Sequence, residues 1–161
     1  MRQISPCLWF DDNAEEAVNY YVSIFPNSKI DNVLRWGEGW GEHGAGKQGK
    51  VLAINFTIEG RPFKALNGGP HFKFNEAVSF FVECKDQAEV DMFWDKLTGD
   101  GGAPSQCGWL KDKFGVSWQI VPVRLMTLMA DPDAAKATRV TQAMLKMQKL
   151  DLPTLERAAA A

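Results

Sequence analysis

The sequence predicts an α+β protein made of two βαβββ units in tandem, followed by a helical tail. In both halves, a strand-like alternation of apolar and polar residues precedes a helical pattern. The second helical pattern repeats the first at a constant interval, and an internal repeat of this kind fixes the topology. The paired apolar positions, each 73 residues apart, are Ala17 and Val90, Tyr20 and Phe93, Tyr21 and Trp94, and Ile24 and Leu97.

The first unit, about residues 3–70, begins with a predicted strand over Ile4–Phe10. Asn13 with Glu16 is a capping-box signature, so we expect the helix to start there. Alternation along the strand turns three side chains away from the helix, toward an expected cavity. These are Ser5, Cys7 and Trp9.

A glycine-dense stretch, Gly37 to Gly49, interrupts the remaining strands of this unit. Its composition predicts a mobile loop. Trp40 and His43 within the stretch either form a lid over a binding site or belong to a disordered segment. The strands around it are expected at Ser28–Trp36, Val51–Ile58 and Phe63–Asn67.

The second unit, about residues 76–122, repeats this order. A strand is predicted over Ala77–Val82, with Ser79 and Phe81 on one face. A second capping-box signature then marks the start of a helix. Its two residues are Asp86 and Glu89.

A β-hairpin closes the second unit. Gly115 occupies a turn position that needs positive φ, and we expect Asp112 to hydrogen-bond back to the turn backbone. In the strand Val116–Val121, Trp118 faces the helix, whereas Gln119 lies on the opposite face. A lone amide on that face indicates a cavity.

Residues 123–161 differ in composition and are expected to form a helical extension packed on a domain covering residues 1–122. Asp131-Pro132-Asp133 is expected to begin a long helix, and Pro153 a short last one. Basic side chains on the long helix favour a solvated face over a docking site for an anionic partner.

Composition narrows the classes of function. The net charge is −2, with 18 basic and 20 acidic residues, and this argues against a nucleic-acid-binding protein. No apolar run is long enough to predict a membrane span, and the first residues lack the apolar core of a signal peptide. Three widely spaced cysteines indicate reduced thiols and a cytoplasmic location. They are Cys7, Cys84 and Cys107.

Three motifs resemble one known family. They are Pro6-Cys-Leu-Trp-Phe-Asp-Asp, then Ala14-Glu-Glu-Ala with Tyr20-Tyr21, and Gly108-Trp-Leu-Lys-Asp-Lys-Phe-Gly-Val-Ser-Trp-Gln. Over residues 3–122 the chain resembles the PhnB-like branch of the vicinal oxygen chelate superfamily, which includes glyoxalases, bleomycin-resistance proteins and extradiol dioxygenases. The resemblance implies curved mixed sheets around a cavity, often within a homodimer.

The PhnB-like branch is often labelled 3-demethylubiquinone-9 3-methyltransferase. A methyltransferase of the usual type needs a doubly wound sheet with a glycine turn that leads into a helix. Here the glycine-dense stretch leads into a strand. We therefore do not expect a Rossmann-type methyltransferase.

Metal-dependent members of the superfamily carry His or Glu at four cavity positions. Mapped by strand face, these positions fall at Ser5, at Ser79 or Ala77, at Gln119, and at Lys64 or Ala65. Such side chains are poor ligands for a divalent cation. His43 and His71 lie in predicted loops, where exposure is the more common state. We expect no bound metal and no other cofactor.

The sequence therefore predicts a metal-independent small-molecule-binding protein whose ligand is apolar or aromatic. Two alternatives stay open: an enzyme of the same superfamily, of lyase, dioxygenase or transferase type, and a dimer whose cavity is vestigial. Cys7 has no visible base beside it and is interpreted as a lining residue. The candidate ligand-binding residues are Ser5, Cys7, Trp9, Trp36, Asn67, Ser79, Phe81 and Gln119.

Overall fold

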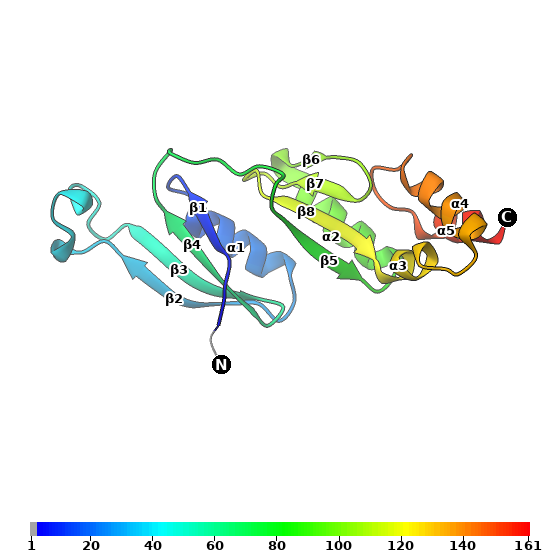
Figure 1. The fold of residues 1–161 in the computed structure, drawn as a ribbon. Coiled ribbons are helices and arrows are strands. Elements are labelled where there is room, and N and C mark those ends of the chain that lie inside the picture. Colours follow the sequence, from blue (N-terminus) through cyan, green and yellow to red (C-terminus); the bar gives the residue numbers. More distant parts are fainter. Residues whose placement is uncertain (1–2) are drawn as a thin grey trace. The chain divides into compact units, whose positions relative to one another are not determined.

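The computed structural model describes residues 3–161, which fold as two compact units divided along the chain between Lys73 and Phe74. Each unit has one four-stranded mixed sheet with a helix against one face (Figure 1). The predicted α+β class and the duplicated βαβββ order are confirmed.

Unit 1 ends at Lys73, and its sheet has the strand order β1-β4-β3-β2. The β1–β4 pair is parallel and the other two pairs are antiparallel. Helix α1 buries Val18 and Tyr21 on the side of the sheet that carries Ile54 and Phe56. The elements are β1 (Cys7–Phe10), α1 (Ala14–Ile24), β2 (Lys29–Arg35), the 3₁₀ helix η1 (Glu38–Gly44), β3 (Val51–Ile58) and β4 (Arg61–Asn67).

Unit 2 begins at Phe74 and repeats the topology with the order β5-β8-β7-β6. Its parallel pair is β5–β8, and α2 packs on the sheet through the buried side chains of Phe93 and Trp94. These two residues are the ones that the 73-residue interval pairs with Tyr20 and Tyr21 of α1. The elements are β5 (Ser79–Cys84), α2 (Gln87–Thr98), η2 (Gly99–Gly101), β6 (Ala103–Pro104), β7 (Trp109–Lys111) and β8 (Ser117–Pro122).

Three helices follow β8: α3 (Val123–Met129), α4 (Ala134–Met144) and α5 (Leu152–Ala160). The predicted helix starts near Asp133 and Pro153 are confirmed, whereas α3 was not predicted and α4 ends at Met144, earlier than the long helix that was expected. They bury a cluster that includes Leu128, Val140 and Leu155 and that also takes in Val121 of β8. Arg139 of α4 donates hydrogen bonds to two carbonyl oxygens at the end of α5. Val121 thus links the helices to β8, whereas Arg139 joins α4 to α5.

The hairpin between β7 and β8 is confirmed. Gly115 has φ +87°, and Asp112 accepts hydrogen bonds from the backbone N–H groups of Phe114 and Val116. Asp112 is also buried and accepts a third bond, 2.9 Å long, from the indole N–H of Trp118. A turn residue thereby ties the hairpin to the core side chain that follows it.

Several predicted boundaries were wrong. The first strand begins at Cys7 and not at Ile4, because the chain pairs with β4 only from that residue onward. The predicted strand Ala77–Val82 lies at Ser79–Cys84, where it pairs with β8. The stretch from Gly37 to Gly49 contains η1 and is not a plain loop. None of the helices within residues 3–161 combines the length and the apolar character needed to cross a membrane.

Candidate functional site

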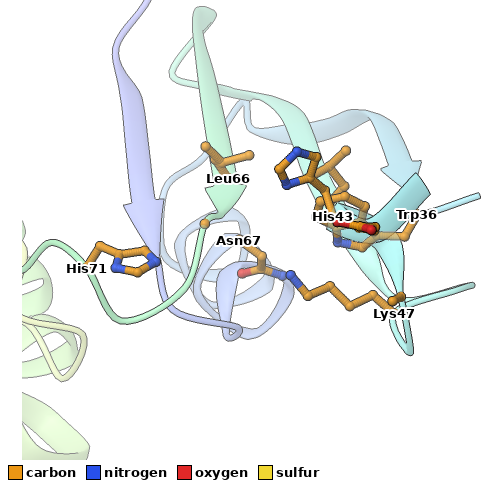
Figure 2. Close-up of a pocket in the computed structure, with 10 residues that line it drawn as sticks. Trp36, His43, Lys47, Leu66, Asn67 and His71 are labelled. Carbon is orange, nitrogen blue, oxygen red and sulfur yellow. The ribbon is translucent and has the colours of Figure 1, made fainter. Parts of the chain in front are cut away.

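A pocket of about 440 Å³ lies in unit 1, at the end of β4 (Figure 2). Its walls come from three places: the start of β3 with the end of β4, the loop that follows β4, and the segment between β2 and β3. Trp36, Leu52 and Leu66 supply apolar surface. The polar lining includes His43, Lys47, Asn67 and His71.

A second hollow of about 580 Å³ adjoins the first and shares Trp36, Lys47, Asn67, Gly68 and His71 with it. Its other lining residues include acidic side chains from the β1–α1 connection and the first turn of α1, and basic side chains from the end of β2 and the position just before β3. The acidic residues are Asp11, Asp12 and Glu15, and the basic ones are Arg35 and Lys50.

The segment between β2 and β3 is folded back on itself. The Trp36 N–H donates to the Lys50 carbonyl and the Gly49 N–H donates to the Trp36 carbonyl, both at 2.9 Å. Trp40 of η1 lies edge-on to the Trp36 ring, with centroids 5.3 Å apart. Lys47 places its ammonium 4.8 Å from the centroid of the same ring. These contacts carry His43 and Lys47 to the pocket.

Asn67 serves the fold as well as the pocket. Its Oδ1 accepts a 2.9 Å bond from the Ala14 N–H, and its Nδ2 donates to the Val51 carbonyl at 3.1 Å. The predicted cap Asn13 makes no side-chain capping bond. Asn67, a candidate ligand-binding residue from the sequence, lines both hollows, and its amide also fixes the start of α1.

Trp9 supports the loop after β4 rather than lining either hollow. Its indole N–H donates to the Gly69 carbonyl at 2.9 Å, and its ring lies edge-on to Phe72 at 4.9 Å. A Cβ on Gly68 would come within 2.1 Å of the Trp9 ring, so only glycine fits there. The loop that carries His71 therefore packs against Trp9.

In unit 2, Ser79 and Gln119 lie on one face of the sheet, as predicted. Gln119 Nε2 donates to Ser79 Oγ at 2.9 Å. Phe81, two residues along β5 from Ser79, has 47% of its surface exposed. Trp118 on the opposite face is only 2% exposed. The structure therefore brings Ser79, Phe81 and Gln119 together within unit 2.

Ser5 and Cys7 stand apart from the pocket of unit 1. Ser5 is half-buried and precedes β1, and Cys7 is exposed at the first position of β1, opposite Lys64. Cys84 is a poor nucleophile, because burial raises the pKa of its thiol to about 12. All three cysteines are free thiols.

Comparison with known proteins identifies the family of this chain. A sequence model of the family described as 3-demethylubiquinone-9 3-methyltransferase matches residues 2–121. The chain belongs to this family. No curated protein matches it.

Two solved structures are similar to the chain. A putative 3-demethylubiquinone-9 3-methyltransferase, PhnB protein, from Bacillus cereus is 34% identical with a TM-score of 0.66, over 76% of this chain and 100% of the other. Protein PA1353 from Pseudomonas aeruginosa is 21% identical with a TM-score of 0.60, over 73% and 95%, and supports the fold alone. The resemblance to the PhnB-like branch of the vicinal oxygen chelate superfamily is confirmed.

The family is described as a methyltransferase, but both sheets of this member are mixed and neither is doubly wound. A doubly wound sheet is what presents a nucleotide at a helix N-terminus in Rossmann-type folds. The family description therefore brings no nucleotide site of that type to the two sheets.

The residues at the superfamily's metal positions do not fit a divalent cation. Gln119 turns its amide N–H toward Ser79, and Lys64 donates to the Asn55 side-chain oxygen at 3.2 Å. An ammonium repels a cation, and a hydroxyl or an amide is a weaker ligand than the imidazoles and carboxylates that hold divalent metals. Within residues 3–161, no three His, Cys, Asp or Glu side chains are grouped so as to hold a metal ion.

Sequence reasoning missed Lys47 as a pocket residue and ranked His43 and His71 as exposed loop side chains. All three are exposed, yet they line the same hollow. A weak signal existed, because His43 and Lys47 lie in the glycine-dense stretch and His71 directly follows Gly68-Gly69-Pro70. Both segments are connections at the ends of strands, where binding residues commonly lie.

Proposed function

We propose that this member of the family binds a small apolar or aromatic molecule in the pocket of unit 1, and that it does so without a metal. The supporting observation is a hollow of about 440 Å³ whose apolar wall is Trp36, Leu52 and Leu66. Small-molecule sites typically measure about 300–1,000 Å³ and combine apolar walls with a few polar groups.

The Trp36 ring is well placed for this role because its backbone is fixed by two hydrogen bonds to Gly49 and Lys50. A ring held in advance loses little conformational entropy when a ligand packs beside it. Asn67 is likewise held by Ala14 and Val51, so the polar end of the pocket is rigid.

A screen of small aromatic compounds by thermal shift and by NMR titration tests this function. We expect binders whose affinity falls in Trp36→Leu and is unchanged in Tyr20→Leu, which alters a half-buried aromatic side chain of α1 outside the pocket. Metal-independent binding predicts the same affinity after exhaustive dialysis against a chelator. Affinity that is lost on chelation and restored by one divalent metal would contradict it.

A second candidate function is an enzyme of the same superfamily. The observation that favours it is that His43 and His71 line one hollow, because imidazoles are common proton donors and acceptors in catalysis. Incubating any binder with the protein and following it by mass spectrometry separates the two. A product that forms with wild-type protein and not with His71→Gln would establish the enzyme.

We further propose a homodimer that works in the cytoplasm, with residues 1–122 as the family domain and 123–161 as its extension. Exposed apolar side chains on β5 and β2, Phe81 and Leu34, support burial against another chain. The free thiols Cys7, Cys84 and Cys107 suit a reducing compartment. Light scattering that gives a monomer mass at micromolar concentration would refute the dimer.

The remaining candidate ligand-binding residues lie outside the pocket of unit 1, and we propose them as further ligand contacts. Ser79, Phe81 and Gln119 form a polar and aromatic patch on one face of unit 2. Ser5, Cys7 and Trp9 belong to the strand β1 and the residues before it. Chemical-shift changes at these side chains on addition of a binder would include them in the ligand site.

A further inference from the structure

The two adjoining hollows of unit 1 share five residues, and this junction carries a positive charge and no negative one. The shared residues are Trp36, Lys47, Asn67, Gly68 and His71. They include one permanent cation and one imidazole but no carboxylate. The acidic residues line one hollow each and are not shared: Glu42 lines the first, and Asp11, Asp12 and Glu15 line the second.

Lys47 and Arg35, both in this region, differ in how their charges are satisfied. Arg35 donates to Glu15 at 3.3 Å and to the Gly49 carbonyl at 3.1 Å. Lys47 holds its ammonium over the face of Trp36. A cation–π contact at an exposed site is weak, and it leaves N–H donors of the ammonium directed elsewhere. Lys47 can therefore bind an anion through its N–H donors without losing an ion pair, whereas Arg35 would first have to separate from Glu15.

The opposite side of the junction is held in place by backbone hydrogen bonds. The Gly68 N–H donates to the Phe10 carbonyl at 2.9 Å, and the Gly69 N–H donates to the Asp11 carbonyl at 3.0 Å. These bonds anchor the start of the loop that carries His71. Figure 2 shows Lys47 and His71 directed toward Asn67 from opposite sides.

We propose that the ligand carries an anionic group, a carboxylate or a phosphonate, which binds between Lys47 and His71 while its apolar part lies against Leu66 and Trp36. This inference rests on the function proposed above and adds the chemical class of the ligand. Carboxylates outside the junction support it, because Glu42 lines only the first hollow and Asp12 only the second, and both repel an anion. Of the basic residues that line only the second hollow, Arg35 already contacts Glu15, and Lys50 is the competing cation.

A matched set of probes tests the charge requirement. 2-Naphthoate, 2-naphthamide and 2-naphthylphosphonate have the same ring system and differ in the charge and shape of one group. Titrations followed by calorimetry and NMR should show one or both anions binding about tenfold or more tightly than the amide, as expected for a hydrogen bond to a charged partner. The ratio between carboxylate and phosphonate identifies which anion the site prefers.

Variants locate the preference. Lys47→Met keeps the unbranched chain as far as Cε and removes the ammonium, so the advantage of the anions over the amide should fall to near unity, with His71→Gln giving a smaller loss. Lys29→Met is the control, because Lys29 pairs with Asp31 at 3.0 Å on β2 and does not line the pocket. An advantage that survives Lys47→Met, or that disappears equally in Lys29→Met, overturns the inference.

The failure of this inference and the failure of the proposed function look different. Equal affinity of wild-type protein for the anions and the amide leaves a binding protein in place and overturns the anionic class. The absence of any binder, among these probes and in the aromatic screen, overturns the binding function itself and the inference with it.

Discussion

The two units share one topology and differ in how each sheet is completed. In unit 1 the strands β2 and β3 have 7 and 8 residues, and the chain between them folds back to make a pocket. In unit 2 the corresponding strands β6 and β7 have only 2 and 3 residues, and the end of β8 is buried by the C-terminal helices. A duplicated framework therefore supports a binding loop in one copy and a packing surface in the other.

The largest expected effect tests the packing side of this comparison. Trp118→Ala in unit 2 removes a side chain that is 2% exposed and that donates to buried Asp112. We expect a loss of about 3–5 kcal/mol in the free energy of unfolding. Urea unfolding measures it.

The neighbouring residue provides the control. Gln119→Ala removes a half-buried amide bonded to Ser79 on the other face, and should change the stability by less than about 1 kcal/mol. Equal destabilisation by the two variants would contradict the assignment of the two faces.

The next effect tests how unit 1 shapes its pocket. Gly68→Ala places a methyl group about 2.1 Å from the Trp9 ring, so the ring or the loop must move. Overpacking of this kind costs about 1–3 kcal/mol. Thermal melts should show the loss, and Gly37→Ala should not, because nothing lies within 4 Å of a Cβ at that position. Unchanged stability in Gly68→Ala would mean that Trp9 is free to yield.

A smaller effect contrasts the caps of the two helices. Asn67→Ala leaves the buried N–H of Ala14 without its acceptor and should cost about 1–2 kcal/mol. Asn13→Ala should be neutral within about 0.5 kcal/mol, because Asn13 makes no capping bond. In unit 2 the predicted cap is real, since Asp86 accepts from the Glu89 N–H at 3.0 Å. A larger loss in Asn13→Ala than in Asn67→Ala would reverse this assignment.

These contrasts show which features the sequence could predict. Gly115, Asp112 and Trp118 interact within a few residues of one another, so their pattern is local and was recognised. The cap of α1 comes from Asn67, 53 residues after Ala14, and local spacing favoured Asn13 instead. Pairing between strands decides such a contact, and the sequence near the helix carries no sign of it.

The pocket was predictable in part for the same reason. Trp36 was identified as an aromatic side chain and Asn67 as a polar side chain suited to a ligand, and both line the pocket. Lys47 was not, because its position depends on how Gly49 bonds back to Trp36 and on the ring contact that follows. The long helix predicted from Asp131 fails in a similar way: Gly108 and Cys107 bond to the carbonyls of Gln148 and Met147, so that stretch leaves the helix to contact the hairpin.

The smallest effect concerns an ion pair that joins α2 to the C-terminal extension. Unit 1 has no such extension, so its helix α1 has no corresponding link. Lys149 lies 2.9 Å from Asp91, and its hydrogen bond to Asp91, followed by the bond from Gln87, lowers the pKa of that carboxyl. A lowered pKa in the folded state means that the stabilising contribution is complete above the unfolded value, near ~3.9, and is lost as the pH falls through the folded value. Both side chains are more than a third exposed, so solvent screening limits the contribution to about 0.2–0.5 kcal/mol.

Lys149→Met should therefore lower the stability slightly at pH 6 and leave it unchanged near pH 2, as urea unfolding at the two pH values can measure. Lys146→Met, an exposed change in the same stretch, is the control. A difference between wild type and Lys149→Met that is as large at pH 2 as at pH 6 would show that the alkyl chain of Lys149, and not its charge, holds the extension to α2.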